Sequence, residues 1–442
     1  MKMFDQLHAG LASIRPFARC GRVKAMENGV ISLAGLAGDA RMGDRVRIDP
    51  AGGGALSAEV LGLDRESVRV LPEDAGDGVA VGDLAVLEGP VGIAPDDSWI
   101  GRIVDPFGAP LDGRPLLPGP HSRPLRSPAP DPVQRGRLGR RLATGMAVFD
   151  TMLPLVEGQR MGLFAGSGVG KSMLLGKFAT SMQADVVVIA LIGERGRELR
   201  DFVEDVLGPK GLARTVVVAA TSDRSPLVRR RCGWAAMAVA EHFRDQGRHV
   251  LLLADSITRF AEAHREVALA AGEPASLRGY PPSLSHTVMS LAERAGPGAQ
   301  GQGAITALFT VLVPGSDMEE PVADTLRGVL DGHVVMDRAI AERGRFPAVD
   351  VLRSVSRSLP AAATPEENAR IAEARRLLGA YDRAEMMIQA GLYEAGSDPL
   401  VDRAIHVWPD LDAFVGRDSP GGIAQSFAIL SRHLDAPAPP KR

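Results

Sequence analysis

The sequence predicts a three-part fold: a small β-barrel, an α/β core built on a mostly parallel sheet, and a C-terminal α-helical domain. Three observations lead to it. Short β-type segments divided by Gly, Asp and Pro turns fill residues 22–91, apolar strands alternate with helical segments from about residue 160, and helical patterns alone follow residue 358. The expected units are 1–20, a short N-terminal helix, then 21–92, 93–357 and 358–442.

The N-terminal part combines a helix with the barrel. Phe4, Leu7, Leu11 and Ile14 recur at helical spacing, which predicts an amphipathic helix over residues 3–15. Its apolar face either packs on the barrel or binds a partner. The barrel strands are expected at 30–33, 45–48, 58–61, 67–71 and 84–87. Dense proline between 105 and 132 then predicts an extended connection.

The core and the C-terminal domain follow from a change in periodicity. Strands are expected at 161–165, 186–192, 216–220, 250–254 and 305–311, with helices between them. After residue 358, Thr364 followed by Pro365 and two glutamates has the residues of a helix start, and Gly391 is the expected stop. Leu377, Tyr381 and Met386 are expected on the apolar face of that helix.

Composition indicates a folded chain with two or three domains. It has 442 residues, of which 45% are hydrophobic and 24% charged, and its net charge of −3 gives no general attraction to nucleic acid. Its apolar runs are far shorter than the roughly 18 residues of a membrane span, and no basic-then-apolar signal opens the sequence. Cys20 and Cys232 have no metal-ligand spacing. We therefore expect a cytoplasmic protein.

A phosphate loop is the strongest motif. The run A-G-S-G-V-G-K-S follows an apolar strand and opens a helix, so its amides can surround a phosphate while the lysine reaches the β and γ oxygens. The alternative is a glycine-rich turn with an exposed lysine. Alanine replaces the usual first glycine, a small-for-small change. The predicted nucleotide-binding residues are Ala165, Gly166, Ser167, Gly168, Val169, Gly170, Lys171 and Ser172.

Mg²⁺ ligands are expected at two positions. The Ser172 hydroxyl is one, and Asp255, which ends the apolar run 250–254, is the other because ligands bind at the carboxyl edge of such sheets. An aspartate at a strand end is otherwise a helix cap. Arg259 follows by one helical turn, on the same face as Asp255 if a helix starts there, and can pair with that carboxylate.

Glu194 is the predicted catalytic base. It follows the strand at 186–192 and should reach the same sheet edge, where it can polarise the attacking water. The alternative places it in the first turn of a helix over 197–206, where the helix dipole favours an acidic residue. Glu198 fits that alternative better.

These residues lie in motifs that resemble a known family. The motifs are R-M-G-L-F-A-G-S-G-V-G-K-S at 160–172, L-I-G-E-R-G-R-E at 191–198, L-A-D-S-I-T-R-F at 253–260, G-Y-P-P-S at 279–283, L-D-G-H-V-V at 330–335 and F-P-A-V-D at 346–350. Together they resemble the catalytic subunits of rotary ATP synthases and their secretion relatives, above all the flagellar type III export ATPases. The resemblance covers nearly the whole chain and implies a RecA-like P-loop nucleotide-binding core that uses ATP and Mg²⁺.

The resemblance also implies residue roles. Lys171 and Ser172 match the phosphate-loop lysine and Mg²⁺ ligand, Glu194 the catalytic glutamate, and Asp255 the Mg²⁺-site aspartate. Arg195 and Arg259 match arginines near the phosphates, Phe346 an adenine-stacking aromatic, and Arg357, in S-V-S-R at 354–357, an arginine finger that reaches into a neighbour's site.

Because one chain carries both the catalytic glutamate and the arginine finger, a ring of identical subunits could complete every site. In rotary synthases the glutamate and the finger belong to different subunits, so the presence of both Glu194 and Arg357 here favours a homohexamer with sites at its interfaces. The family implies further partners: a stalk-like regulatory protein, export chaperones with cargo, and the membrane export gate. It also implies a position at the cytoplasmic face of the inner membrane.

Four alternatives differ in function. An injectisome ATPase shares these motifs. A noncatalytic ring subunit should lack a glutamate at the position of Glu194, and a rotary synthase subunit should carry a long acidic C-terminal loop. A Rho-like translocase needs a basic, aromatic front end, whereas residues 1–92 hold ten Lys and Arg against thirteen Asp and Glu, and their aromatic residues are Phe4 and Phe17. No nucleic-acid partner is expected.

Overall fold

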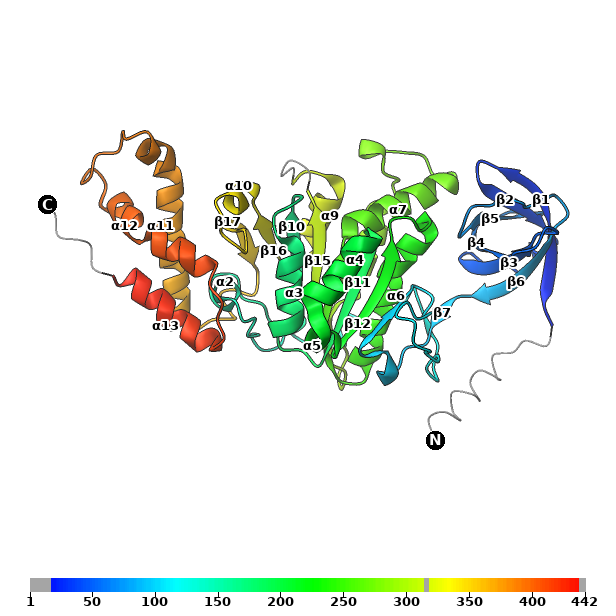
Figure 1. Cartoon of the computed structure of the whole chain (residues 1–442), viewed down its shortest axis with the longest axis horizontal. Coiled ribbons are helices and arrows are strands. Elements are labelled where there is room, and N and C mark those ends of the chain that lie inside the picture. The colour runs from blue at the N-terminus through cyan, green and yellow to red at the C-terminus, as the bar shows by residue number, and fades with distance from the viewer. Residues whose placement is uncertain (1–16, 314–317, 437–442) are drawn as a thin grey trace.

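A computed structural model describes residues 17–313 and 318–436. The described chain is elongated, with a barrel at one end, helices at the other and an α/β core between them (Figure 1). The predicted helix over residues 3–15, with Phe4, Leu7, Leu11 and Ile14, lies outside the described residues. In the part that is described, no helix is both long enough and apolar enough to cross a bilayer.

Six antiparallel strands close the N-terminal barrel in the order β1-β2-β5-β4-β3-β6. Alternate side chains such as Ile31, Leu33 and Val46 are fully buried and fill it. The predicted barrel is confirmed, and its opening strand was not among the five expected. The strands are β1 (Arg19–Glu27), β2 (Val30–Ala34), β3 (Asp44–Asp49), β4 (Leu56–Leu63), β5 (Val68–Pro72) and β6 (Leu84–Pro90).

The central sheet runs in the order β17-β16-β10-β15-β13-β11-β12-β8, with β14 beside β15. Its strands from β16 to β8 are parallel, as predicted, while β17 and β14 pair antiparallel. The five predicted strands are present as β10 (Arg160–Ala165), β11 (Val186–Glu194), β12 (Thr215–Thr221), β13 (His249–Asp255) and β15 (Ala304–Leu312).

Four strands of this sheet were not predicted. They are β8 (Arg102–Val104), β14 (Gly296–Pro297), β16 (Gly332–Met336) and β17 (Val349–Ser356). All four are short or lie toward a sheet edge, where the apolar runs that signal buried parallel strands weaken. The connection expected over 105–132 contains one two-residue strand, β9 (Arg123–Pro124), which pairs with β7 (Gly92–Ile93).

Helices cover both faces of the sheet. One face packs against α6 (Pro226–Asp245), α7 (Ile257–Ala270), α8 (Leu284–Glu293) and α9 (Pro321–Val329). The other packs against α2 (Ala147–Asp150), α3 (Lys171–Ser181), α4 (Gly196–Asp201), the π-helix η2 (Phe202–Leu207) and α5 (Gly208–Leu212). The short helices η1 (Asp97–Trp99), η3 (Leu277–Gly279) and α10 (Arg338–Glu342) lie in connections. The helix expected over 197–206 is thus α4 continued by η2.

Three helices form the C-terminal end: α11 (Pro365–Gln389), α12 (Pro399–Val415) and α13 (Gly422–Leu434). Thr364 and Glu367 cap α11 reciprocally, and Gly391 adopts the left-handed φ of 68° that ends it. The prediction that Met386 lies on the apolar face of α11 was wrong, because Met386 is 84% exposed. Ala380 and Ala384 set the buried face, and Met386 falls two positions later, on the opposite side.

Candidate active site

Lys171, Glu194 and Asp255 meet at the carboxyl edge of the sheet. Glu194 and Asp255 are the last residues of β11 and β13, and Lys171 opens α3 after the loop that follows β10. The parallel order of these strands brings their carboxyl ends to one edge. The Lys171 ammonium forms an ion pair with Asp255 Oδ1, and its Nζ lies 3.9 Å from Glu194 Oε1. One cation thus lies between two carboxylates.

The phosphate loop leaves its amide groups available. Gly168 and Gly170 adopt positive φ angles of 77° and 83°, which let the chain turn tightly before α3 begins at Lys171. Across the described residues, no backbone hydrogen bond engages the amides of residues 166–170. Such unpaired N–H groups ahead of a helix form an anion site. Lys171 is largely buried, with 13% of its side chain exposed, so the alternative of an exposed lysine on a simple turn is wrong.

The two flanks of the loop are fixed by burial. Ala165 ends β10 and is 1% exposed, and its carbonyl accepts the N–H of Val313 at 3.0 Å. Val169 is also 1% exposed and anchors the loop, whereas Ser167 and Ser172 are exposed. A small residue suits the buried position of Ala165.

Asp255 is buried beside a hydroxyl that the sequence did not reveal. Thr310 Oγ1, on β15, lies 2.8 Å from Asp255 Oδ1. The cap of α7 is Ser256, whose side chain accepts the N–H of Arg259, so the alternative in which Asp255 caps the helix is wrong. No local motif marks Thr310, because its contact depends on which strand lies beside β13.

Glu194 ends β11 ahead of the helix. Arg195 is the N-cap of α4 and Glu198 occupies its first turn, so the alternative that placed Glu194 inside that turn is wrong. Burial, then the Asp255 charge, raises the pKa of Glu194 to about 7 against the opposing effect of Lys171. A hydrogen bond from Glu194 lowers the pKa of Glu198.

Arg195 and Arg259 border the site without touching Asp255. Arg195 Nη1 pairs with Glu198 at 3.0 Å and its side chain is 80% exposed. Arg259 Nη1 pairs with Glu262 at 2.9 Å, so the expected alternative of a pair with Asp255 is wrong. Arg259 nevertheless lies beside Gly193, the residue before Glu194, since a Cβ added to Gly193 would lie 3.3 Å from the Arg259 Cβ.

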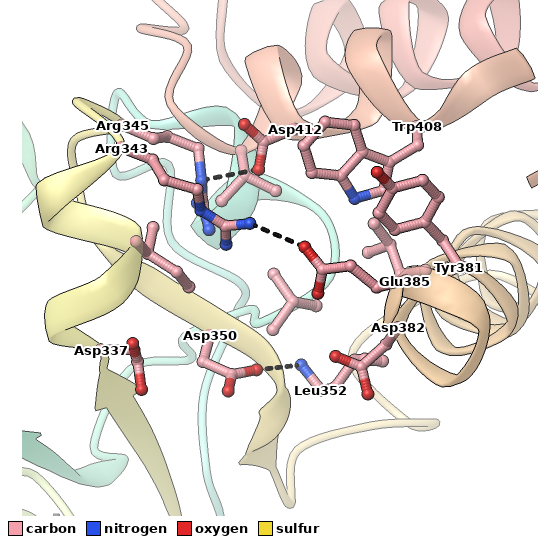
Figure 2. Close-up of a pocket in the computed structure, with 14 residues that line it drawn as sticks. Asp337, Arg343, Arg345, Asp350, Leu352, Tyr381, Asp382, Glu385, Trp408 and Asp412 are labelled. Atoms are coloured by element: carbon pink, nitrogen blue, oxygen red, sulfur yellow. Dashed lines mark hydrogen bonds and ion pairs between the residues drawn. The ribbon is translucent and has the colours of Figure 1, made fainter. Parts of the chain in front are cut away.

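Phe346 lies against the phosphate loop. A Cβ added to Gly170 would lie 3.0 Å from Phe346 Cδ1, and the ring is 47% exposed. The preceding Arg345 pairs with Asp412 of α12 at 2.9 Å, as Figure 2 shows. Both residues line a pocket in which Arg343 also pairs with Glu385 of α11 at 3.3 Å (Figure 2). The segment carrying Phe346 is therefore held between the core and the C-terminal helices.

Arg357 lies at the opposite edge of the sheet. Strand β17 runs antiparallel to β16, with Val349 beside Met336 and Ser356 beside Gly332. Met336 in turn pairs with Ala165 at the phosphate-loop end of β10. The exposed Arg357 follows Ser356 at the other end. The six residues of β10 separate the two edges by roughly 17 Å at about 3.3 Å per residue.

Comparison with known proteins matches this architecture. The family model "ATP synthase alpha/beta family, nucleotide-binding domain" matches residues 145–356, and the "T3SS EscN ATPase C-terminal domain" matches 363–420. A flagellum-specific ATP synthase of Caulobacter vibrioides is 45% identical over 97% of this chain and 99% of its own length. The chain belongs to the flagellum-specific ATP synthase family. It is accordingly an ATPase of type III protein export.

Type III secretion ATPases are also similar to this chain. A type 3 secretion system ATPase of Pseudomonas syringae pv. tomato is 43% identical over 90% of this chain and 89% of its own length. The assembled ATPase EscN of the enteropathogenic E. coli type III secretion system superposes with a TM-score of 0.86 at 36% identity, covering 94% of this chain and all of EscN. EscN in complex with its central stalk EscO gives 0.85 at the same identity and coverage. The predicted fold class is thereby confirmed.

Proposed function

We propose that this chain hydrolyses ATP as a homohexameric ring whose sites are shared between subunits, and that it powers flagellar type III export. One observation carries the shared site: Arg357 lies at the sheet edge away from Lys171 and Glu194 of its own chain. A finger in that position serves the site of a neighbouring subunit. The assembled state of EscN supports a ring.

The residues at the carboxyl edge have different roles in ATP hydrolysis. The amides of 166–170 and Lys171 bind the phosphates, and Phe346 stacks on the adenine. Glu194 takes a proton from the attacking water, a role suited to a carboxyl whose pKa is near neutral. Arg195, Arg259 and Arg357 of the neighbouring subunit stabilise the charge that develops on the transferred phosphoryl group.

Ser172 and Asp255 would hold Mg²⁺. A hydroxyl and a carboxylate supply oxygen donors of the kind that this ion prefers. Ser172 follows Lys171 in the first turn of α3, and Asp255 forms an ion pair with Lys171. The ion would neutralise phosphate charge when bound. Lys171, which pairs with Asp255 here, then exchanges that carboxylate for the phosphates.

The proposal extends to partners and location. The EscN–EscO complex supports a stalk-like regulatory partner. Export chaperones with cargo, the membrane export gate and a cytoplasmic position against the inner membrane complete the proposal. The injectisome ATPases are the second candidate, favoured by the match of residues 363–420 to the EscN C-terminal domain. Loss of swimming in a deletion strain supports the flagellar assignment, and a strain that still swims contradicts it.

Mixing two inactive variants tests the shared site. Lys171→Ala destroys a subunit's own phosphate loop and Arg357→Ala removes the finger that it lends. Each alone should be inactive, whereas mixed rings should recover ATP turnover at interfaces where an intact loop meets an intact finger. A mixture of Lys171→Ala with Glu194→Gln is the control, because both changes damage the same half of the site. Absence of recovery in the first mixture contradicts shared sites.

A further inference from the structure

We propose that Gln159 is a positioning residue that holds the arginine finger for the neighbouring subunit's site. The inference rests on the proposed role of Arg357. Gln159 is completely buried at the amino edge of the sheet, immediately before β10. That strand leads into the phosphate loop, so Gln159 lies at the far end of the strand from its own nucleotide site.

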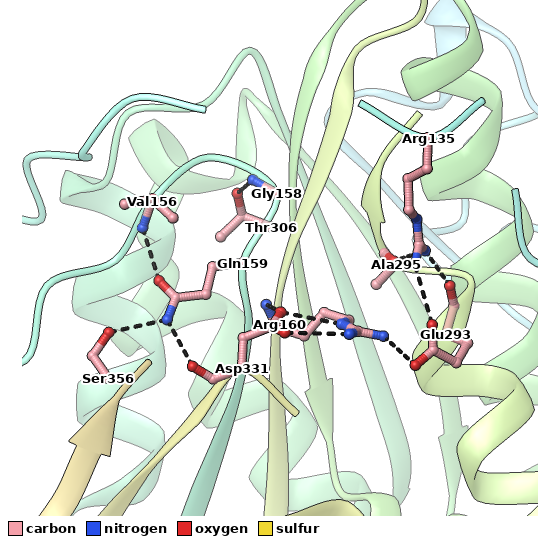
Figure 3. Close-up of polar contacts among 10 residues, drawn as sticks. All are labelled: Arg135, Val156, Gly158, Gln159, Arg160, Glu293, Ala295, Thr306, Asp331 and Ser356. Carbon is pink, nitrogen blue, oxygen red and sulfur yellow. Dashed lines mark hydrogen bonds and ion pairs between the residues drawn. The ribbon is translucent and has the colours of Figure 1, made fainter. Parts of the chain in front are cut away.

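Each hydrogen-bonding group of the Gln159 amide has a partner, and two of the three contacts reach the finger segment. Its Nε2 donates to Ser356 Oγ at 3.0 Å and to the Asp331 carbonyl at 3.1 Å, while its Oε1 accepts from Val156 N at 3.0 Å (Figure 3). Ser356 is the residue before Arg357. The Asp331 carbonyl also accepts the backbone N–H of Arg357 at 3.0 Å.

Asp331 is itself fixed from β10. Its carboxylate accepts Arg160 Nε at 3.1 Å and Arg160 Nη2 at 3.2 Å, and Arg160 extends to Glu293 at 2.6 Å (Figure 3). Gly332 allows β17 to approach, since a Cβ there would lie 2.5 Å from the Val355 carbonyl. These contacts set the backbone of Arg357, whose side chain stays exposed. The strand that presents the phosphate loop thus also fixes the finger lent to the neighbour.

Gln159→Met removes the amide at nearly constant volume. We expect ring turnover to fall by about 10²-fold, the effect of a small displacement of a catalytic group, with the KM for ATP nearly unchanged. The matched control is Thr306→Val. Thr306 is also fully buried at this edge and bonds Gly158 N at 2.9 Å and His249 at 2.8 Å, but no hydrogen bond in the described chain joins its side chain to β17. Its turnover per assembled ring should match the unsubstituted protein.

Mixed rings separate positioning from damage to the strand. Gln159→Met subunits keep their own phosphate loop, so mixing them with Lys171→Ala should restore turnover, while mixing them with Arg357→Ala should not. Unchanged turnover of Gln159→Met, or recovery with neither partner, overturns the inference. Ser356→Ala, which changes the finger side of the same contact, replaces Gln159→Met in these mixtures if that variant fails to fold. If Lys171→Ala and Arg357→Ala fail to complement each other, the proposed shared site is wrong and this inference fails with it. If those two variants complement each other, but Gln159→Met does not recover with Lys171→Ala or does recover with Arg357→Ala, this inference alone fails.

Discussion

The two edges of the central sheet differ in how their polar groups are paired. At the carboxyl edge, one lysine faces Asp255 and Glu194, and the loop amides have no backbone partner in the described chain. At the amino edge, the Gln159 amide uses both its N–H groups and its carbonyl, and Arg160 and Arg135 share Glu293. Loop N–H groups without a backbone partner leave room for a ligand, whereas the fully paired Gln159 amide fixes a backbone.

A single substitution at the carboxyl edge should therefore lower the rate of ATP hydrolysis. Glu194→Gln keeps the shape of the site but removes the base, so kcat should fall by roughly 10²- to 10⁴-fold while ATP still binds. Steady-state turnover and the Kd of ATP, measured on the same preparation, check this. Asp201→Asn, an exposed change on the neighbouring helix α4, is the control and should leave kcat unchanged. Normal turnover in Glu194→Gln would remove Glu194 from the mechanism.

The border of the same edge should respond more weakly. Phe346→Ala removes a half-exposed ring beside Gly170, and base stacking contributes about 1–3 kcal/mol, so the Kd of ATP should rise roughly tenfold with kcat nearly constant. Phe346→Tyr keeps the aromatic face and should retain affinity. Titration of a fluorescent ATP analogue measures both variants. Equal affinity in Phe346→Ala would show that adenine binds elsewhere.

The sequence predicted more of the functional residues at the carboxyl edge than at the amino edge. Glu194 and Asp255 end apolar strands and Lys171 opens the helix that follows a third, and the carboxyl ends of parallel strands gather at one edge. Thr310 was missed because its contact with Asp255 depends on strand order. Gln159 and Ser356 meet across 197 positions of the chain, through a strand pairing that no local pattern reveals. Local motifs predict chemistry, and the register of distant strands decides what supports it.

The smallest predicted effect is a change in stability with pH at the carboxyl edge. Burial and Asp255 raise the pKa of Glu194 to about 7 in the folded chain, above the value of about 4.5 expected when unfolded. Between these values the folded state binds more protons, so this carboxyl lowers the free energy of unfolding as pH rises from about 4.5 to 7. Above pH 7 the cost is on the order of 1–2 kcal/mol, allowing for the 20% exposure of the side chain.

Glu194→Gln removes that cost because glutamine stays neutral. At pH 8 and without nucleotide, the variant should melt on the order of 1–3 °C above the unsubstituted chain, whereas at pH 4, below both pKa values, the two should melt nearly together. Thermal melts across this pH range measure the difference, and Asp201→Asn should show no such dependence. A Gln159→Met variant should instead be less stable at both pH values, because it loses the neutral hydrogen bonds of the Gln159 amide at the amino edge. If Glu194→Gln raised the melting temperature equally at all pH values, the comparison would be contradicted. The destabilisation at the carboxyl edge would then not arise from the buried charge of Glu194.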